Sequence, residues 1–315
     1  MSRRQVIGVD AGGTKLLAGV VDHTLAVSHT VRHVWAHRGR AETVTAMVEA
    51  VKKLHEAASA ASAVGFGIPS LVDHPTGISR WSNHLALDDF DFAAEVSDRI
   101  GLPVVVDNDA SAAVLAEHRF GAAKGADHAA LVALGTGIGG GLVLGGQVYR
   151  GAHGFAGEIG HMVVDHEGEE CPGDCPGRGC LEALASGRAI GRAGERAAAA
   201  APDSELGRHL SEHGTVPGDL VTELALAGDA GSRAVLAEIG RRLGAGITGL
   251  VNLLDLEVVV VGGGAAAAGD LLLDPARAVV AARALPPVAE RVRIVPAAFG
   301  EEAGMLGAAL LAMDA

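Results

Sequence analysis

Short apolar runs separated by glycine turns dominate the first part of the chain. Residues 6–10 and 16–21 are apolar segments on either side of a Gly-Gly turn, which predicts a β-hairpin, and residues 26–35 supply a third strand. Residues 41–55 then carry apolar side chains at helical spacing and charged side chains on the other face. The pattern therefore predicts a sheet followed by an amphipathic helix with one buried face.

Two later apolar runs, residues 63–67 and 103–106, have the composition of strands that are buried on both faces. The second run leads into a helix that we expect over about 110–119. The order of strand, glycine turn and strand then recurs over residues 130–145. This repetition predicts a duplicated α/β architecture with a cleft between its two halves.

Two polar segments separate these elements. Residues 121–127 are the most loop-like stretch between the halves, and we expect a hinge there. Residues 201–218 are polar and contain prolines and glycines, so we expect a surface excursion between helices.

The composition is that of a globular protein with a core of small aliphatic side chains. Of the 315 residues, 49% are hydrophobic, only 3% are aromatic and 45 are glycine. A net charge of −13 and few aromatic rings disfavour nucleic-acid binding, which needs a cationic surface and stacking platforms. The uncharged residues 129–149 are broken by glycines, which disfavours a membrane span, and the N-terminus has no apolar signal core, so we expect a cytoplasmic protein.

All three cysteines lie within ten residues, at Cys171, Cys175 and Cys180, and His161 stands ten positions before the first of them. Three thiols and one imidazole form a complete tetrahedral ligand set for Zn²⁺, and the intervening Pro and Gly residues allow the necessary turns. In a reducing cytosol, an odd number of clustered cysteines favours metal ligation over disulfides. The alternative is a core histidine beside a redox-active group of thiols.

The first glycine turn has the residue types of a phosphate site. Its backbone amides can point at phosphate oxygens, and Asp10 just before it can hold Mg²⁺ through water. A Gly-Gly pair is common in hairpin turns in general, so this motif alone is weak evidence for phosphate binding. The residues that we expect to bind phosphate here are Gly12, Gly13, Thr14 and Lys15.

Two more glycine turns follow apolar strands. The turn of residues 135–141 has more glycine than a hairpin needs, and Thr136 adds a hydroxyl for a β- or γ-phosphate. Residues 258–261 form a buried strand whose terminal glycines would let an adenosine lie across the backbone. Three such turns indicate nucleotide binding far better than one; the expected contacts are Gly135, Thr136, Gly137, Gly262, Gly263 and Gly264.

Five motifs occur in a fixed order: Asp10-x-Gly-Gly-Thr-Lys15, Asn108-Asp109, Leu134-Gly-Thr-Gly-Ile-Gly-Gly-Gly141, Gly157-Glu-Ile-Gly-His161 and Gly179-Cys-Leu-Glu182. In order and spacing they resemble the ROK family of repressors and sugar kinases, and within it the zinc-containing bacterial glucokinases. The resemblance spans nearly the whole chain. It implies an actin-like, hexokinase-type (ribonuclease H-like) α/β fold whose two lobes close over ATP and a sugar.

The resemblance also implies the lobe boundaries. We expect a small N-terminal lobe of residues 1–119 plus 301–315, to which the C-terminal helix returns. The large lobe would then cover residues 120–300 and carry the zinc loop 161–180.

The resemblance implies that Asp109 is the general base, which takes the proton of the sugar's 6-hydroxyl as that oxygen attacks the γ-phosphate. The alternative is that Asp109 merely caps the following helix. The expected sugar-binding residues are Asn83, Asn108, Asp109, Glu158, His161 and Glu182. Taken singly, the glutamates would be solvent-facing charges and the asparagines loop residues bonded to local backbone. His161 has two candidate roles, since one ring nitrogen can bind zinc while the other faces the sugar.

Two departures from the family pattern concern the sugar pocket. The family spacing resembles C-x-C-x₄-C, whereas two extra residues separate Cys171 from Cys175 here. We expect zinc binding to survive this change. Ser70 stands where glucose enzymes of the family commonly have glycine or alanine, which leaves the identity of the sugar open.

The favoured function is an ATP- and Mg²⁺-dependent kinase for the 6-hydroxyl of a hexose, with glucose as the first candidate. N-acetylmannosamine, N-acetylglucosamine and fructose remain alternatives, as does polyphosphate as donor. A repressor would need a DNA-binding domain, and only nine residues precede Asp10, so we do not expect one. A non-catalytic binding module is disfavoured because every motif is present. The family implies a homodimer or homotetramer.

Overall fold

The computed structural model describes residues 5–35, 39–82 and 85–315. The chain forms two compact units. The first unit comprises Met1–Gly125, Gly141–Gly157 and Glu301–Ala315, and the second comprises Ala126–Gly140 and Glu158–Gly300. The lobe boundaries expected from the sequence stay predictions.

The first unit contains a five-stranded sheet in the order β3-β2-β1-β4-β8. Its strands are β1 (Gln5–Ala11), β2 (Lys15–Asp22), β3 (Val27–Val34), β4 (Ala61–Ile68) and β8 (Val104–Asn108). The strands β1, β2 and β3 are antiparallel, whereas β4 and β8 run parallel to β1. The predicted hairpin and both predicted buried strands are therefore confirmed.

Helices and a small sheet cover this framework. They are α1 (Arg40–Ala57), α2 (Phe92–Ile100), α3 (Asp109–Arg119) and α11 (Ala303–Asp314), together with β5 (Leu71–Asp73), β6 (Ile78–Trp81) and β7 (Phe90–Asp91). The helix α1 buries Val44, Met47 and Leu54 against the sheet, as its apolar spacing predicts. The aromatic rings of Phe66 and Phe92 meet edge to face within the same core.

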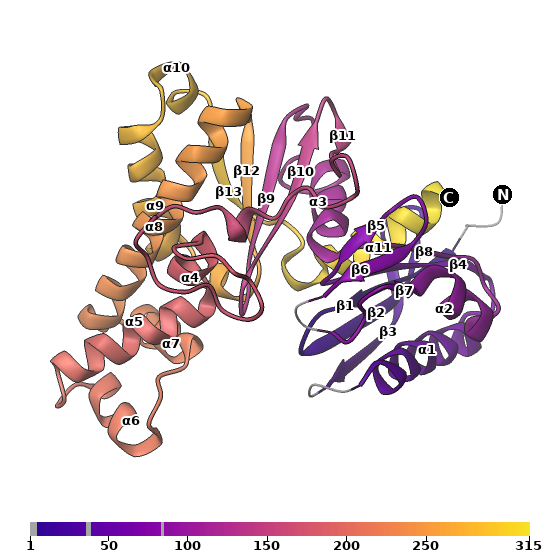
Figure 1. The fold of residues 1–315 in the computed structure, drawn as a ribbon, viewed down its shortest axis with the longest axis horizontal. Coiled ribbons are helices and arrows are strands. Elements are labelled where there is room, and N and C mark those ends of the chain that lie inside the picture. Colours follow the sequence, from indigo (N-terminus) through magenta and orange to yellow (C-terminus); the bar gives the residue numbers. More distant parts are fainter. Residues whose placement is uncertain (1–4, 36–38, 83–84) are drawn as a thin grey trace. The chain divides into compact units, whose positions relative to one another are not determined.

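The C-terminal helix α11 returns to the first unit and packs against β1, β4, β8 and α3 (Figure 1). Glycines make this close approach possible. A methyl group at Gly65 would overlap the carbonyl oxygen of Ala308, and one at Gly307 would overlap the carbonyl oxygen of Ala112. Backbone therefore packs directly on backbone along this helix, so these glycines serve packing and not turns.

A second five-stranded sheet has the order β11-β10-β9-β12-β13. Its strands are β9 (Ala129–Leu134), β10 (Ile138–Leu144), β11 (Gln147–Val148), β12 (Val258–Gly262) and β13 (Arg293–Pro296). The expected turn over residues 135–141 is wrong in extent, because β10 already begins at Ile138. Gly141 lies inside this strand, where a methyl group would meet the carbonyl oxygen of Ala110 at 2.5 Å.

Apart from β9, β12, β13 and the start of β10, the second unit is helical. Its α-helices are α4 (Leu181–Ala185), α5 (Gly187–Ala200), α6 (Glu205–His213), α7 (Gly218–Ala227), α8 (Ala230–Leu254), α9 (Asp270–Arg283) and α10 (Pro286–Ala289). Short 3₁₀ turns are η1 (Ile159–His161), η2 (Gly264–Ala268) and, at the junction with the first unit, η3 (Gly300–Glu302). The segment 201–218 lies mostly at the surface between α5 and α7, as expected, but its centre forms the helix α6, which is capped by the Ser204 side chain. Within the described ranges, no helix has the length and apolar character needed to cross a membrane.

The packing of α11 yields a stability prediction. Gly307→Ala should lower the free energy of unfolding by about 1–3 kcal/mol or more, because the added methyl group has only backbone to displace. Gly249→Ala is the matched control in α8, where nothing lies within 4 Å of the new methyl group, and it should raise stability by up to about 1 kcal/mol. Urea unfolding of both variants tests this; equal effects would contradict the packing argument.

Candidate active site and metal centre

The first glycine turn joins β1 to β2 and is held from outside by Trp35. The indole Nε1 of Trp35 donates to the carbonyl oxygen of Gly12 at 3.0 Å, and its backbone N–H donates to that of Thr14 at 3.1 Å. At the end of the turn, the Lys15 ammonium pairs with Glu301 at 2.9 Å, and Arg32 pairs with the same carboxylate at 3.0 Å. The backbone of the turn is thus fixed, while Lys15 stands at the surface.

Asp10, the expected magnesium residue, lies near the end of β1 beside the first turn of α11. A methyl group at Gly304 would lie 2.6 Å from its Oδ2, so only glycine leaves room for the carboxylate. Burial is the largest of the effects that raise the pKa of Asp10 to about 7, and the negative charges of Asp109 and Glu301 add to it, whereas Lys15 lowers it. Asp109 therefore lies close enough for its negative charge to raise the pKa of Asp10.

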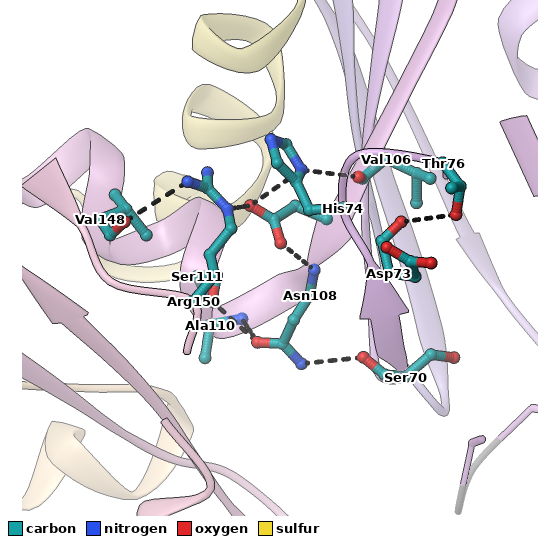
Figure 2. Close-up of polar contacts among 11 residues, drawn as sticks. Ser70, Asp73, His74, Thr76, Val106, Asn108, Ala110, Ser111, Val148 and Arg150 are labelled. Carbon is teal, nitrogen blue, oxygen red and sulfur yellow. Dashed lines mark hydrogen bonds and ion pairs between the residues drawn. The ribbon is translucent and has the colours of Figure 1, made fainter. Parts of the chain in front are cut away.

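Asn108 ends β8 and caps α3. Its Oδ1 accepts hydrogen bonds from the backbone N–H groups of Ala110 and Ser111, each at 3.0 Å, and its Nδ2 donates to the carbonyl oxygen of Ser70 at 3.4 Å (Figure 2). Asp109 is the first residue of the helix, and its Oδ1 accepts from the N–H of Ala110 at 2.8 Å. The alternative that Asp109 is the helix cap is therefore wrong, since Asn108 is the cap.

Ser70 lies directly beside Asn108 and is buried. Its hydroxyl has no hydrogen-bond partner within the described part of the chain. A buried hydroxyl without a partner carries a desolvation cost that a ligand can relieve. This geometry is compatible with the expectation that Ser70 adjoins the sugar.

Asp107 is a buried carboxylate that the sequence analysis missed. It has no exposed surface, and its Oδ2 lies 2.7 Å from the Arg150 Nε and 3.7 Å from the His74 Nδ1. In the sequence Val-Val-Val-Asp-Asn-Asp of residues 104–109, only Asn108 and Asp109 were given a predicted role. A charged side chain within an apolar strand was the available signal, because such a charge needs a buried partner.

In the second unit, Glu182 braces the turn between β9 and β10. It lies buried in α4, and its Oε2 accepts from the N–H of Ile138 at 2.7 Å. A methyl group at Gly137 would overlap this oxygen, and Gly187 donates to the carbonyl oxygen of Gly135 at 2.9 Å. The alternative that Glu182 is a solvent-facing charge is therefore wrong.

The third glycine turn follows β12. Gly263 has φ +83° and packs on the backbone of Leu134, where no side chain would fit. Gly262 adjoins Ala297, whereas a methyl group at Gly264 would meet nothing within 4 Å. Packing alone explains Gly263, and the contact of this turn with adenosine stays a prediction.

The three cysteines and His161 converge in the second unit. Their four ligand atoms all lie within 4.8 Å of one another, with the His161 Nδ1 3.5 Å from the Cys171 Sγ. The other ring nitrogen, Nε2, lies 3.9 Å from a carboxylate oxygen of Glu158, whose side chain is half-exposed. The longer spacing from Cys171 to Cys175 is accommodated, and His161 faces the thiols on one side and Glu158 on the other.

The donor set fits a metal ion. Tetrahedral zinc with Zn–S bonds of about 2.3 Å needs ligand atoms about 4 Å apart, as found in this cluster. The N–H of Gly177 also points at the Cys175 Sγ at 3.4 Å, and a side chain at this glycine would come within 2.8 Å of the Cys180 Sγ. Burial, followed by contact with the neighbouring thiols, raises the pKa of Cys171, so the thiolates need a cation for compensation.

Asn83, the remaining expected sugar ligand, lies outside the described residues. The other expected site residues fall into two groups according to their unit. Asp10, the turn from Gly12 to Lys15, Asn108 and Asp109 belong to the first unit. The turn of residues 135–137, Glu158, His161, Glu182 and the three cysteines belong to the second.

Taken together, the fold and these residues define the class of protein: a two-lobe α/β protein of the actin-like, hexokinase type. A family model described as "ROK family" matches residues 6–315, and the chain belongs to this family. It is 35% identical to a glucokinase of Halalkalibacterium halodurans over 316 residues. The aligned region covers 98% of this chain and 94% of the relative.

Solved structures agree with the family. A ROK family glucokinase from Streptomyces griseus, in complex with glucose and AMPPNP, is 34% identical with a TM-score of 0.88 and covers 99% of this chain and 100% of that chain. A ROK family transcriptional regulator, a homologue of the E. coli MLC protein, is 27% identical with a TM-score of 0.87 and covers 98% of this chain and 78% of that chain. The same framework thus occurs in kinases and in regulators.

The raised pKa of Asp10 predicts a pH-dependent stability difference. The folded protein holds this proton up to about pH 7, whereas the unfolded chain releases it near the ordinary value of 3.8. Because the folded state binds more protons in this interval, the contribution of Asp10 to the free energy of unfolding falls as the pH rises from about 4 to about 7. Asp10→Asn, measured without nucleotide or Mg²⁺, should therefore gain stability over the wild type across this interval. Urea midpoints at several pH values test this, and a difference independent of pH would contradict it.

Proposed function

We propose that this protein is an ATP-dependent glucose kinase that transfers the γ-phosphate of ATP to the 6-hydroxyl of the sugar. The observation that carries the proposal is the position of Asp109 in the structure. Asp109 is the first residue of α3 and lies near enough to the buried Asp10 to raise the pKa of that carboxyl group, while Asn108 caps the helix. The overall similarity to a kinase solved with glucose and AMPPNP supports the same function.

In the proposed reaction, Asp109 accepts the proton of the 6-hydroxyl as that oxygen attacks the γ-phosphorus. The new O–P bond forms while the bond between the γ-phosphorus and the β,γ-bridging oxygen breaks, and ADP leaves. Asp109 is the first residue of α3, so its carboxylate lies at the positive end of the helix dipole.

Asp10 is the residue that we propose to hold Mg²⁺, through water. Lys15 compensates the buried carboxyl group only in part, since its pKa stays raised, and this suits a cation partner. Bound Mg²⁺ neutralises charge on the β- and γ-phosphates. The residues that we propose to bind the phosphates are Gly12, Gly13, Thr14 and Lys15, and Gly135, Thr136 and Gly137. Gly262, Gly263 and Gly264 are proposed to adjoin the adenosine.

The sugar hydroxyls would be bound by polar side chains that are already oriented by protein contacts. Glu182 gives one oxygen to the N–H of Ile138 and would use the other for a hydroxyl. The Asn108 amide, Glu158 and His161 are proposed as further sugar ligands, together with Asn83. Glucose is the preferred candidate because the relatives compared above include glucokinases, and the buried Ser70 is the residue that we expect to influence the choice of sugar.

The metal of the His161 and cysteine cluster is proposed to be a structural Zn²⁺. The three sulfur atoms and one nitrogen atom favour zinc over hard cations. Zinc bound to Nδ1 would fix the ring of His161 and orient Nε2 beside Glu158. We also propose a cytoplasmic location, where reduced thiols persist. The expected homodimer or homotetramer stays a prediction.

The kinase proposal predicts that Asp109→Asn abolishes turnover. ADP release from ATP and Mg²⁺ should be rapid with glucose and should fall by about 10²–10⁴-fold in this variant, because the amide cannot take up the proton. The assay panel includes fructose, N-acetylglucosamine and N-acetylmannosamine, with polyphosphate as a second donor. Asp98→Asn, which changes an exposed carboxylate on α2, is the matched control and should retain full activity.

Two outcomes would contradict this proposal in different ways. Rapid turnover with another sugar and not with glucose would contradict the assignment of glucose as substrate but support the kinase activity. No turnover on the whole panel by folded protein that binds ATP would leave a binding function in place of catalysis.

The metal proposal predicts about one equivalent of zinc in protein purified without added metal. Cys175→Ser and His161→Ala should each lower the zinc content and the thermal midpoint, because each removes one of four ligands. His166→Ala, which changes an exposed neighbouring histidine outside the cluster, is the control and should keep its zinc. Elemental analysis after desalting gives the answer; unchanged zinc in both ligand variants would exclude this cluster as its site.

A further inference from the structure

Asp107 is fully buried at the end of β8, two positions before the proposed base. Removing a carboxylate from water costs several kcal/mol unless other groups compensate its charge. Its Oδ2 receives the Arg150 Nε at 2.7 Å, and the His74 Nδ1 lies 3.7 Å from the same oxygen (Figure 2). The kinase mechanism proposed above gives these three side chains no role.

Arg150 comes from a loop that is itself closed and fixed. Its carbonyl oxygen accepts from the N–H of Ala156 at 3.0 Å, and Gly151 and Gly154 have φ values of +74° and +89°. Gly154 packs so closely on the carbonyl oxygen of Val72 that no side chain fits between them. The loop is therefore seated on β5, and the Arg150 side chain reaches from it to β8.

The other carboxylate oxygen of Asp107 is hydrogen-bonded to the residue that caps α3. Its Oδ1 accepts from the N–H of Asn108 at 2.9 Å, and the side chain of Asn108 in turn caps the first turn of α3. Asp109 is the first residue of that turn. A continuous series of hydrogen bonds thus runs from the Arg150 guanidinium through Asp107 and Asn108 to the backbone that carries Asp109.

We propose that Arg150 and Asp107 are positioning residues for the phosphoryl transfer: the guanidinium holds Asp107, and Asp107 fixes the backbone from which Asp109 presents its carboxylate. This inference rests on the proposed kinase function. Neither residue is assigned a contact with substrate. Displacing a reacting group by about 1 Å can cost on the order of a hundredfold in rate, so a fixed backbone here affects kcat.

The alternative is an ion pair that only stabilises the fold. The two roles separate in a double variant, because replacing both members of a buried pair by apolar residues is often neutral for stability, whereas removing one is costly. Asp107→Leu combined with Arg150→Met should therefore restore much of the stability lost in Arg150→Met alone. Its kcat should stay low, since Leu cannot accept from the N–H of Asn108.

The experiment compares wild type, Arg150→Met, Arg150→Lys and the double variant at saturating glucose and ATP, well below their unfolding temperatures. We expect kcat to fall at least about tenfold in Arg150→Met and in the double variant, with partial recovery in Arg150→Lys, and KM for ATP to change less than about twofold. Arg241→Met is the matched control, since its partner Glu238 lies on the surface of α8 at 2.7 Å, and it should leave kcat unchanged. Wild-type kcat in the double variant would overturn the inference.

A second readout does not depend on activity. Hydrogen exchange at the N–H groups of Ala110 and Ser111, which Asn108 caps, should be faster in Arg150→Met and in the double variant than in wild type or Arg241→Met. If wild-type protein phosphorylates no sugar on the panel, the proposed function fails, and the exchange rates still decide whether Arg150 orders this turn. Unchanged exchange rates in the variants would overturn the inference.

Discussion

Buried carboxylates that need compensation are the constraint on which the proposed site depends. Asp107 forms an ion pair with the Arg150 guanidinium. Glu182 accepts a hydrogen bond from a backbone N–H and packs against Gly137. Asp10 is buried with less compensating charge, so its pKa rises to about 7. The first two carboxylates serve to hold backbone in place, whereas the third is buried with too little compensation to stay charged below about pH 7. A site that must attract a cation needs such a group, and its cost to stability is the expected consequence of function.

The thiol cluster follows the same principle with different chemistry. Burial and mutual proximity raise the pKa of Cys171 and of Cys180, so the loop holds its sulfur atoms in a state that a metal ion would stabilise. The Nε2 of His161, directed at Glu158, connects this cluster to a proposed sugar ligand. Metal binding would therefore order a substrate-binding segment as well as the loop itself.

Features that depend on neighbouring residues could be predicted from the sequence, and features that depend on distant partners could not. Apolar periodicity located the hairpin, α1 and the strands β4 and β8 because each is a local pattern. The helix α6 was missed although Ser204 and Gly214 cap its two ends, because its polar composition was interpreted as that of a loop. Gly141 was assigned to a turn, yet it lies in a strand and permits contact with α3.

The site shows the same division. The motif residues, including the four metal ligands, could be named because their spacing carries the information. Asp107 could not be given a role, since its partner Arg150 lies 43 positions later and only the fold brings the two together. Likewise, the alternative that Asp109 caps the helix stayed open until the backbone of α3 was known, which makes Asn108 the cap.

Membership of the ROK family does not by itself decide between catalysis and regulation, because a kinase and a regulator both match this fold with TM-scores near 0.9. The difference must lie in a few side chains. A binding protein needs hydroxyl ligands but has no use for a carboxyl group at a helix N-terminus near a second, buried carboxyl group with a raised pKa. Two nearby carboxyl groups, Asp10 near the end of β1 and Asp109 at the start of α3, oppose folding when both are charged, and they are expected only where a cation and a proton must be handled in the same place. The pairing of Asp10 with Asp109 is for this reason a stronger argument for phosphoryl transfer than the fold.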